Sequence, residues 1–174
     1  MKSLLFALGL TSATFVQAEQ FEDFDLSRIK RDQYITAMTS NCKKMKKMLP
    51  HMKASPVTFE QKSADEIKMT IDRNKKKRCK KITSVFKREN GVFTSQGKGC
   101  KKTMKQIEMN DISMYTSMNV TRGERQCTVA SLTVTNLNDT EMAMDGFRSF
   151  ADGAGLANEN IHTLSRDGMC ERSS

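Results

Sequence analysis

Residues Asp139–Cys170 read DTEMAMDGFRSFADGAGLANENIHTLSRDGMC and contain the clearest helical pattern in the chain. The apolar residues of its first half recur every three or four positions, which predicts an amphipathic helix with one buried face. They are Ala143, Phe147, Phe150, Ala151 and Ala154.

The same stretch also carries signals for the ends of this helix. Asn138 followed by Glu141 can satisfy the first free amides, and Gly153 and Gly155 indicate the stop. Beyond the glycines the chain is extended and apolar only at intervals until Cys170. A single helix, a short strand and a terminal cysteine together predict a brace packed against a larger body.

The first 18 residues have the features of a secretory signal peptide. Lys2 gives the positive start, LLFALGL the apolar core, and Val16–Ala18 a small-residue cleavage site. The mature chain is therefore expected to begin at Glu19, leaving one domain at residues 19–174. The apolar run is too short to cross a bilayer and no later stretch is apolar enough, so we predict a secreted protein that does not span a membrane.

The chain is basic, with a formal net charge of +9. This charge favours an anionic ligand, surface or other partner, although basic residues can also serve only to keep loops solvated. Nucleic acid is not an expected partner for a secreted chain. We expect a monomer or a weak dimer.

Alternating apolar and polar residues predict strands through most of the chain. The clearest alternation begins at Ile112, and Asn90-Gly91 is a hairpin signal. About eight short strands precede the helix, and no helix is predicted between them, which favours an all-β fold: an eight-stranded antiparallel up-and-down barrel with one C-terminal helix, rather than a sandwich. The predicted strands lie at or around residues 34–38, 57–59, 66–72, 79–87, 92–96, 104–109, 112–121 and 126–134.

This order of elements resembles the lipocalin family. The tail GLANENIHTLSRDGMC is similar to the family's helix exit, in which a Gly-Leu or Gly-Ile step precedes E-N-I, a Leu and a closing Cys. The segment YITAMTSNC (34–42) resembles the family's W-Y-x-I-A-x-A-S-N-C. The resemblance covers nearly the whole mature chain.

Three family motifs are altered. The G-x-W motif falls at Arg31–Gln33, where both the Gly and the Trp are missing, and the T-D-Y motif falls at Asn110–Ile112, where only the Asp remains. The family's Arg at the end of the eighth strand is Val134 or Asn136 here. Because that Arg packs on the Trp in the family, we expect the barrel floor to be plugged differently.

Five cysteines in a secreted chain predict disulfides and one leftover thiol. The resemblance implies a Cys79–Cys170 bond that fastens the tail to the barrel, with a stabilisation of roughly 4 kcal/mol in the chain-entropy model. For the others we predict Cys100–Cys127, with Cys42 free or available for an intermolecular link. No pair has C-x-x-C spacing and the two histidines are isolated, so neither a metal site nor a cofactor is predicted.

The sequence does not indicate an enzyme. It has no Ser/His/Asp set and no paired acids that suggest catalysis. The lipocalin that isomerises a prostaglandin has its nucleophile in the second strand, and the matching stretch here, HMKASPVTF, contains no cysteine.

The apolar strand faces are interpreted as barrel interior, part of it the wall of a ligand cavity. Thirteen methionines, one of them the initiator, suit a deformable lining and a flexible apolar ligand. An ordinary packed core is the alternative. The candidate cavity residues are Ile67, Met69, Ile71, Met114, Thr116, Met118, Val120, Ala130 and Leu132.

The basic residues concentrate in the odd-numbered connections, which share one end of an up-and-down barrel. That end is the open mouth of a lipocalin, so a basic rim is predicted around the entrance. Its members are Lys43, Lys44, Lys46, Lys47, Lys75, Lys76, Lys77, Arg78, Lys98, Lys101, Lys102, Arg122 and Arg125.

Three functions remain open at this stage. The first is a carrier for a small hydrophobic anion, such as a fatty acid, retinoid or eicosanoid. The second is a module that attaches to sulfated glycan, anionic lipid or a cell coat through the basic rim. The third is a siderophore-type bulky anion held by cations, which requires lysines that point inward.

Two N-x-[ST] sequons predict glycosylation, at Asn119 and Asn138. Asn138 lies at the predicted helix start, where its side chain can serve as the cap. Asn119 is therefore expected to be the likelier site of the two.

Overall fold

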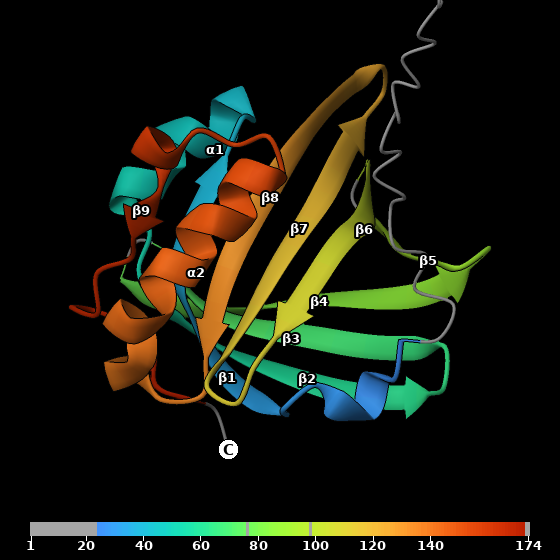
Figure 1. Cartoon of the computed structure of the whole chain (residues 1–174), viewed down its shortest axis with the longest axis horizontal. Helices are drawn as coiled ribbons and strands as arrows, with labels where there is room; N and C mark the ends of the chain where they lie inside the picture. Colours follow the sequence, from blue (N-terminus) through green and yellow to red (C-terminus); the bar gives the residue numbers. More distant parts are fainter. Residues whose placement is uncertain (1–23, 76, 98, 173–174) are drawn as a thin grey trace, which may run out of the picture.

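Strand β1 closes the sheet into a barrel, because it pairs with β2 on one side and with β8 on the other (Figure 1). The remaining strands pair in chain order and antiparallel, which confirms the predicted up-and-down barrel. The strands are β1 (Asp32–Ser40), β2 (Ser55–Ser63), β3 (Glu66–Lys75), β4 (Arg78–Glu89), β5 (Val92–Gly97), β6 (Cys100–Met109), β7 (Ser113–Arg122), β8 (Arg125–Val134) and the short β9 (His162–Thr163).

This computed structural model describes residues 24–75, 77–97 and 99–172. The predicted signal peptide, the expected N-terminus at Glu19, Lys76 and Lys98 lie outside these residues. The helices are α1 (Lys43–Met48) and α2 (Thr140–Gly153), with 3-10 turns η2 (Leu26–Arg28), η3 (Leu49–His51), η4 (Leu137–Asp139) and η5 (Asn158–Asn160).

Helix α2 lies across the outside of the barrel, over β7 and β8 (Figure 1). Its predicted apolar stripe is buried, with Phe147 at 0% and Phe150 at 4% exposure. Both rings pack on Tyr115 of β7, at centroid distances of 6.2 and 5.8 Å. The outer face of this part of the barrel is therefore as apolar as a protein core.

The ends of α2 differ in how well the sequence predicted them. At the C-terminus Gly155 has φ +72°, and the amide of Leu156 donates to the Ala151 carbonyl at 2.9 Å, which is the predicted glycine stop. At the N-terminus the predicted Asn138 cap is wrong. Asn136 caps the preceding turn η4 instead, by accepting from the Asn138 amide at 3.0 Å.

The tail after α2 is fastened to the barrel at several points. The Cys79–Cys170 disulfide implied by the family resemblance is present, and β9 pairs with the outer edge of β1. Further along, Arg172 makes an ion pair with Asp32 at 2.6 Å and lies 4.8 Å over the Tyr34 ring. The tail is the expected brace, and Arg172 is a contact that sequence patterns did not indicate.

The barrel floor uses a polar contact where the family pattern has Trp. Gln33, at the Trp position, is 2% exposed, accepts from the Thr133 hydroxyl at 2.7 Å and donates to the Lys30 carbonyl at 2.9 Å. Leu26 of η2, 2% exposed, packs against the apolar interior. The expectation of a floor plugged differently is therefore confirmed.

Helix α1 corrects the prediction that no helix lies between the strands. The helix has only six residues, too few to show a helical period. Pro50 lies within the following turn η3, whose Leu49 is 1% exposed. This buried leucine anchors the segment to the barrel.

We predict that Gly146→Ala destabilises the protein. A Cβ at Gly146 would lie 2.4 Å from the Tyr115 hydroxyl oxygen, which itself donates to the Ala143 carbonyl at 3.1 Å. Overpacking of this kind costs about 1–3 kcal/mol, more than alanine gains in helix propensity. Thermal unfolding measures the effect.

Gly153→Ala is the matched control, because nothing lies within 4 Å of a Cβ at that position of the same helix. It should be neutral or raise stability by up to about 1 kcal/mol. Equal melting temperatures for the two variants would refute the close packing of α2 on Tyr115.

Candidate functional site

The inward and outward faces of β7 and β8 follow from their register. Thr116 is paired with Ser131, and their hydroxyl oxygens are 2.8 Å apart inside the barrel, whereas Tyr115 and Leu132 form the next pair and face α2. Side chains alternate along each strand, so Met114, Met118 and Val120 also point inward, as predicted.

The prediction that Ala130 and Leu132 line the cavity is wrong. Both are 0% exposed in the cluster between the barrel wall and α2. The inner face of β8 instead carries Val129, Ser131 and Thr133. The apolar alternation of β8 was read correctly, but the apolar face is the outer one because a helix covers it.

The floor half of the interior is packed. Side chains from β2 to β7 converge there with Leu26 and Ile29, and the space left among them is only about 20 Å³. Ligand cavities usually measure about 300–1,000 Å³. The predicted cavity residues Ile67, Met114 and Thr116 therefore belong to a core in this structure.

The inner face of the barrel is more exposed to solvent in the mouth half. Ile82 faces Ile71 across the β3–β4 pair on the inner face, yet it is 39% exposed. We call the inward-facing residues of this half the mouth chamber. They are Ile71, Arg73, Lys80, Ile82, Ser84, Lys102, Met104, Met118 and Val120.

Lys102 lies inside this chamber rather than on the rim. It pairs with Ser95 on β5 and with inward-facing Val120 on β7. Its Nζ donates to the Ser84 Oγ at 2.8 Å, bridging to β4 where β5 no longer pairs with that strand. The sequence had placed Lys102 in a loop because the predicted strand began at Met104, two residues later and on the same face.

Burial lowers the pKa of Lys102, and a smaller opposing effect comes from the neighbouring Cys100. Among the described residues no carboxylate lies within ion-pair distance of its ammonium group. A desolvated cation without a counter-charge is unfavourable. The mouth chamber therefore holds a cation that has no counter-charge among the described residues.

The other predicted rim cations lie at the mouth end. Lys75 is opposite Arg78 at one hairpin tip, and Arg122 is opposite Arg125 at another. Lys101 points outward from β6, and Lys77 is exposed in the β3–β4 turn. The four lysines of α1 (Lys43, Lys44, Lys46 and Lys47) are all exposed.

The predicted Cys100–Cys127 disulfide is wrong, because β7 lies between β6 and β8. Two strand spacings of about 4.8 Å exceed the Cα separation that a disulfide can span. Cys127 instead bonds Cys42, at a Cα–Cα distance of 5.1 Å. Ser40 pairs with Val129, and two residues further the same register brings Cys42 opposite Cys127.

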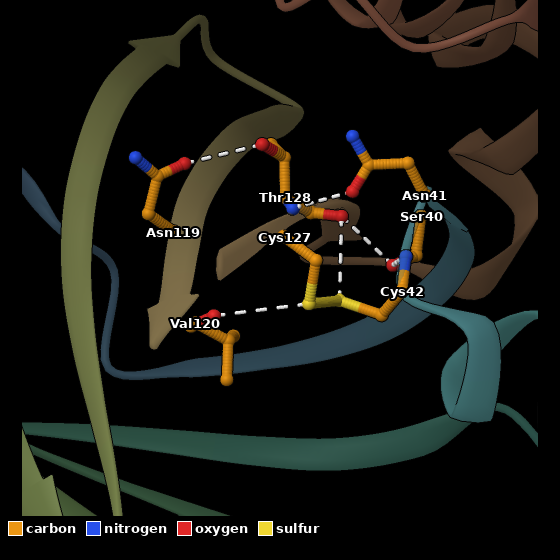
Figure 2. The surroundings of a disulfide bond; sticks show 7 residues. All are labelled: Ser40, Asn41, Cys42, Asn119, Val120, Cys127 and Thr128. Carbon is orange, nitrogen blue, oxygen red and sulfur yellow. Dashed lines mark hydrogen bonds between the residues drawn. A yellow bond between two sulfur atoms is a disulfide. The ribbon is translucent and has the colours of Figure 1, made fainter. Parts of the chain in front are cut away.

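Hydrogen bonds surround this disulfide (Figure 2). The Cys42 amide donates to Ser40 Oγ at 3.0 Å, and the Ser40 hydroxyl in turn donates to the Thr128 carbonyl at 2.8 Å. The Thr128 amide donates to Asn41 Oδ1 at 2.6 Å. The start of α1 is thus joined rigidly to β8 at the mouth. Cys100 is the free thiol of the described residues, with its Sγ 3.2 Å from the Gly97 carbonyl.

Within the described ranges, no group of three His, Cys, Asp or Glu residues is arranged to hold a metal ion. No described helix is long and apolar enough to span a membrane.

Comparison with known proteins places this geometry in a family. A sequence model of the lipocalin / cytosolic fatty-acid binding protein family matches residues 34–168. No curated protein sequence matches the chain.

Solved structures share the fold. The siderocalin Ex-FABP is 18% identical, with 83% of this chain and 94% of that chain covered and a TM-score of 0.69. The bovine lipocalin allergen Bos d 2 is 19% identical, with 84% and 98% covered and a TM-score of 0.69. Odorant binding protein OBP1 is 14% identical, with 86% and 100% covered and a TM-score of 0.69.

We predict that Lys102→Met raises the melting temperature near neutral pH, because it replaces a desolvated ammonium with an apolar chain. The folded pKa lies below the ordinary 10.5, so the unfolded state binds more protons between these two values. Wild-type stability should therefore rise with pH through that window, and its deficit relative to the variant should shrink. Thermal unfolding from neutral pH to pH of about 10 measures this.

The matched control is Lys101→Met, which changes the outward-facing neighbour on the same strand. It should leave the melting temperature nearly unchanged at every pH. A loss of stability in Lys102→Met that does not vary with pH would contradict the assignment.

The structure changes the expected order of the two glycosylation sites. Asn119 is half-buried and accepts from the Thr128 hydroxyl at 3.1 Å (Figure 2), whereas Asn138 is exposed on η4, where its Oδ1 accepts a longer bond of 3.3 Å from exposed Arg166. We now predict that Asn138 carries more glycan than Asn119. Intact mass of Asn138→Gln and Asn119→Gln, expressed by a secretory host, tests this: a mass loss confined to Asn119→Gln would contradict it.

Proposed function

Because the chain belongs to the lipocalin / cytosolic fatty-acid binding protein family, we propose that it is a carrier for a small hydrophobic anion. The ligand is of the class of a fatty acid, a retinoid or a compact aromatic acid. Its anionic group binds Lys102, and its apolar body occupies the mouth chamber.

The observation that carries this proposal is the position of Lys102. The ammonium group is held by Ser84 inside the barrel and has no carboxylate partner among the described residues. A ligand carboxylate would supply the missing counter-charge, and a charge-assisted hydrogen bond is stronger than a neutral one. A siderophore-type anion would require cations that point into the barrel. Lys102 meets this requirement, and Arg73 and Lys80 lie on the same inner face.

The apolar part of the ligand is expected to contact Ile71, Met104, Met118 and Val120. Two of these are methionines, whose flexible side chains adapt to different shapes. The packed floor, with about 20 Å³ of free space, limits how deep a chain can reach. We therefore favour a compact or medium-length body over a long chain that extends to the floor.

Secretion and the lack of catalysis are parts of the same proposal. Two disulfides suit an extracellular protein. Among the described residues, the inner face of the mouth chamber carries Lys80 and Lys102 but no His, Asp or Glu in its register. These features support ligand storage or transport rather than acid–base chemistry.

We predict that Lys102→Met weakens binding of a fluorescent fatty acid by about 10-fold or more, because a hydrogen bond to a charged group contributes about 1.5–3 kcal/mol. Binding of the alcohol analogue, which lacks the charge, should change little. Fluorescence titration with each probe measures both affinities.

Two controls separate the chamber from the rim. Lys101→Met should leave both affinities unchanged, and Lys75→Gln at the exposed tip should weaken the acid by only a few-fold, since exposed ion pairs contribute about 0–1 kcal/mol. The proposal fails if wild-type protein shows no saturable binding, or if Lys102→Met weakens acid and alcohol equally.

A further inference from the structure

The two ends of the barrel differ in whether their basic side chains form ion pairs. At the floor end, cations pair with acids: Lys68 with Glu60 at 3.3 Å, Lys87 with Glu66 at 3.4 Å, and Arg88 with Asp65 at 3.0 Å. At the mouth end, no ion pair includes a rim cation in the part of the chain that the structure describes. Among the described residues, the positive charge of the rim is therefore not neutralised by ion pairs.

The mouth end of the barrel also places like charges directly opposite each other, both on the rim and in the mouth chamber. Lys75 faces Arg78 and Arg73 faces Lys80 in the β3–β4 hairpin, and Arg122 faces Arg125 in the β7–β8 hairpin. Such cross-strand pairs are destabilising. Charges dispersed over the surface would make the protein equally soluble without this repulsion, so solubility alone does not explain the clustering.

Helix α1 also places like charges close together, with four lysines within six residues. Its lysines repel at i,i+4 (Lys43–Lys47) and at i,i+3 (Lys43–Lys46, Lys44–Lys47), and its first turn has no acid. Lys43 and Lys44 in the first turn also oppose the helix dipole, whereas Lys46 and Lys47 in the last turn are favoured by it. The helix is nevertheless held in place, by the Cys42–Cys127 disulfide before it and by buried Leu49 after it.

We propose that α1, together with the hairpin tips at the mouth, binds a linear sulfated polysaccharide. A fixed array of exposed lysines that form no ion pair with any described residue matches a chain of closely spaced anionic groups, and such attraction grows with the number of charges engaged. This function is independent of the carrier role, because the α1 lysines are outside the barrel and Lys102 is inside it.

An anionic membrane surface fits the rim less well. The large hydrophobic side chains that are exposed among the described residues are Ile82, Val85 and Met142. Ile82 points into the mouth chamber, Val85 lies on the outer face of mid-β4, and Met142 is on α2. None of them is at the rim to insert between lipids, which leaves the charge itself as the recognition element.

The test is chromatography on immobilised heparin with a salt gradient. The variant carries Lys43→Gln, Lys44→Gln, Lys46→Gln and Lys47→Gln. The matched control loses the same four charges elsewhere, through Lys62→Gln, Lys68→Gln, Lys87→Gln and Arg148→Gln. We expect wild type and control to elute well above physiological salt (about 0.15 M), and the α1 variant to elute at markedly lower salt.

Folding and carrier function are checked in parallel. Thermal unfolding of the α1 variant should match or exceed wild type, because the substitutions remove repulsion within the helix. Its affinity for the fatty-acid probe should be unchanged, and Lys102→Met should keep wild-type retention on heparin. Failure of the polysaccharide proposal would thus be visible without any failure of the carrier proposal.

Four results would overturn the inference. Wild type could elute below physiological salt, or the two four-charge variants could shift equally, which would indicate net charge alone. The third is equal competition by heparin and by heparin stripped of sulfate. The fourth is stronger retention by vesicles containing phosphatidylserine than by heparin, which would point to a different anionic partner.

Discussion

Closure of the barrel by β1 is the constraint on which the other features depend. Once β1 pairs with both β2 and β8, every strand has one face inside and one outside, and a shift of one residue would exchange them. The pairing of Tyr115 with Leu132 then fixes the surface on which α2 docks, and the pairing of Lys102 with Val120 fixes a cation inside the mouth. The same register brings Cys42 opposite Cys127, so the fold, the site and one disulfide share one cause.

The sequence predicted the strand order, the helix and the tail disulfide because each leaves a local or family-specific pattern. It could not predict which face of β8 is inside. Alternation shows that Ala130 and Leu132 share a face, but an outer face under a helix is as apolar as a barrel interior, and the inner face here is the more polar one, with Ser131 and Thr133. The pairing of Cys100 with Cys127 failed for a related reason, since sequence spacing does not show that β7 separates their strands.

Lys102 illustrates a second limit of sequence reasoning. In a run of basic residues its side chain was assigned to the rim with its neighbours, although it lies two residues before inward-facing Met104 on one strand. Only the register separates Lys102 from Lys101, which points outward. The sequence does not show that the Lys102 ammonium group is buried, because this burial depends on Ser84 and Ser95 from other strands. The floor shows the converse: absence of the family's Trp was visible in the sequence, but its replacement by the Gln33–Thr133 contact was not.

The positive charge of the mouth has two physically different components. Lys102 is desolvated, so an anion that reaches it gains from a low-dielectric environment and is little affected by salt. The α1 lysines are exposed and contribute individually little, so they act only in number and only on a ligand with repeated charges. Lys102 therefore attracts a single small anion into the barrel, whereas the α1 lysines bind a polyanion that is too large to enter. Because the Cys42–Cys127 bond joins α1 to the mouth wall, a polyanion bound on α1 would lie outside the barrel beside the entrance, without contacting Lys102.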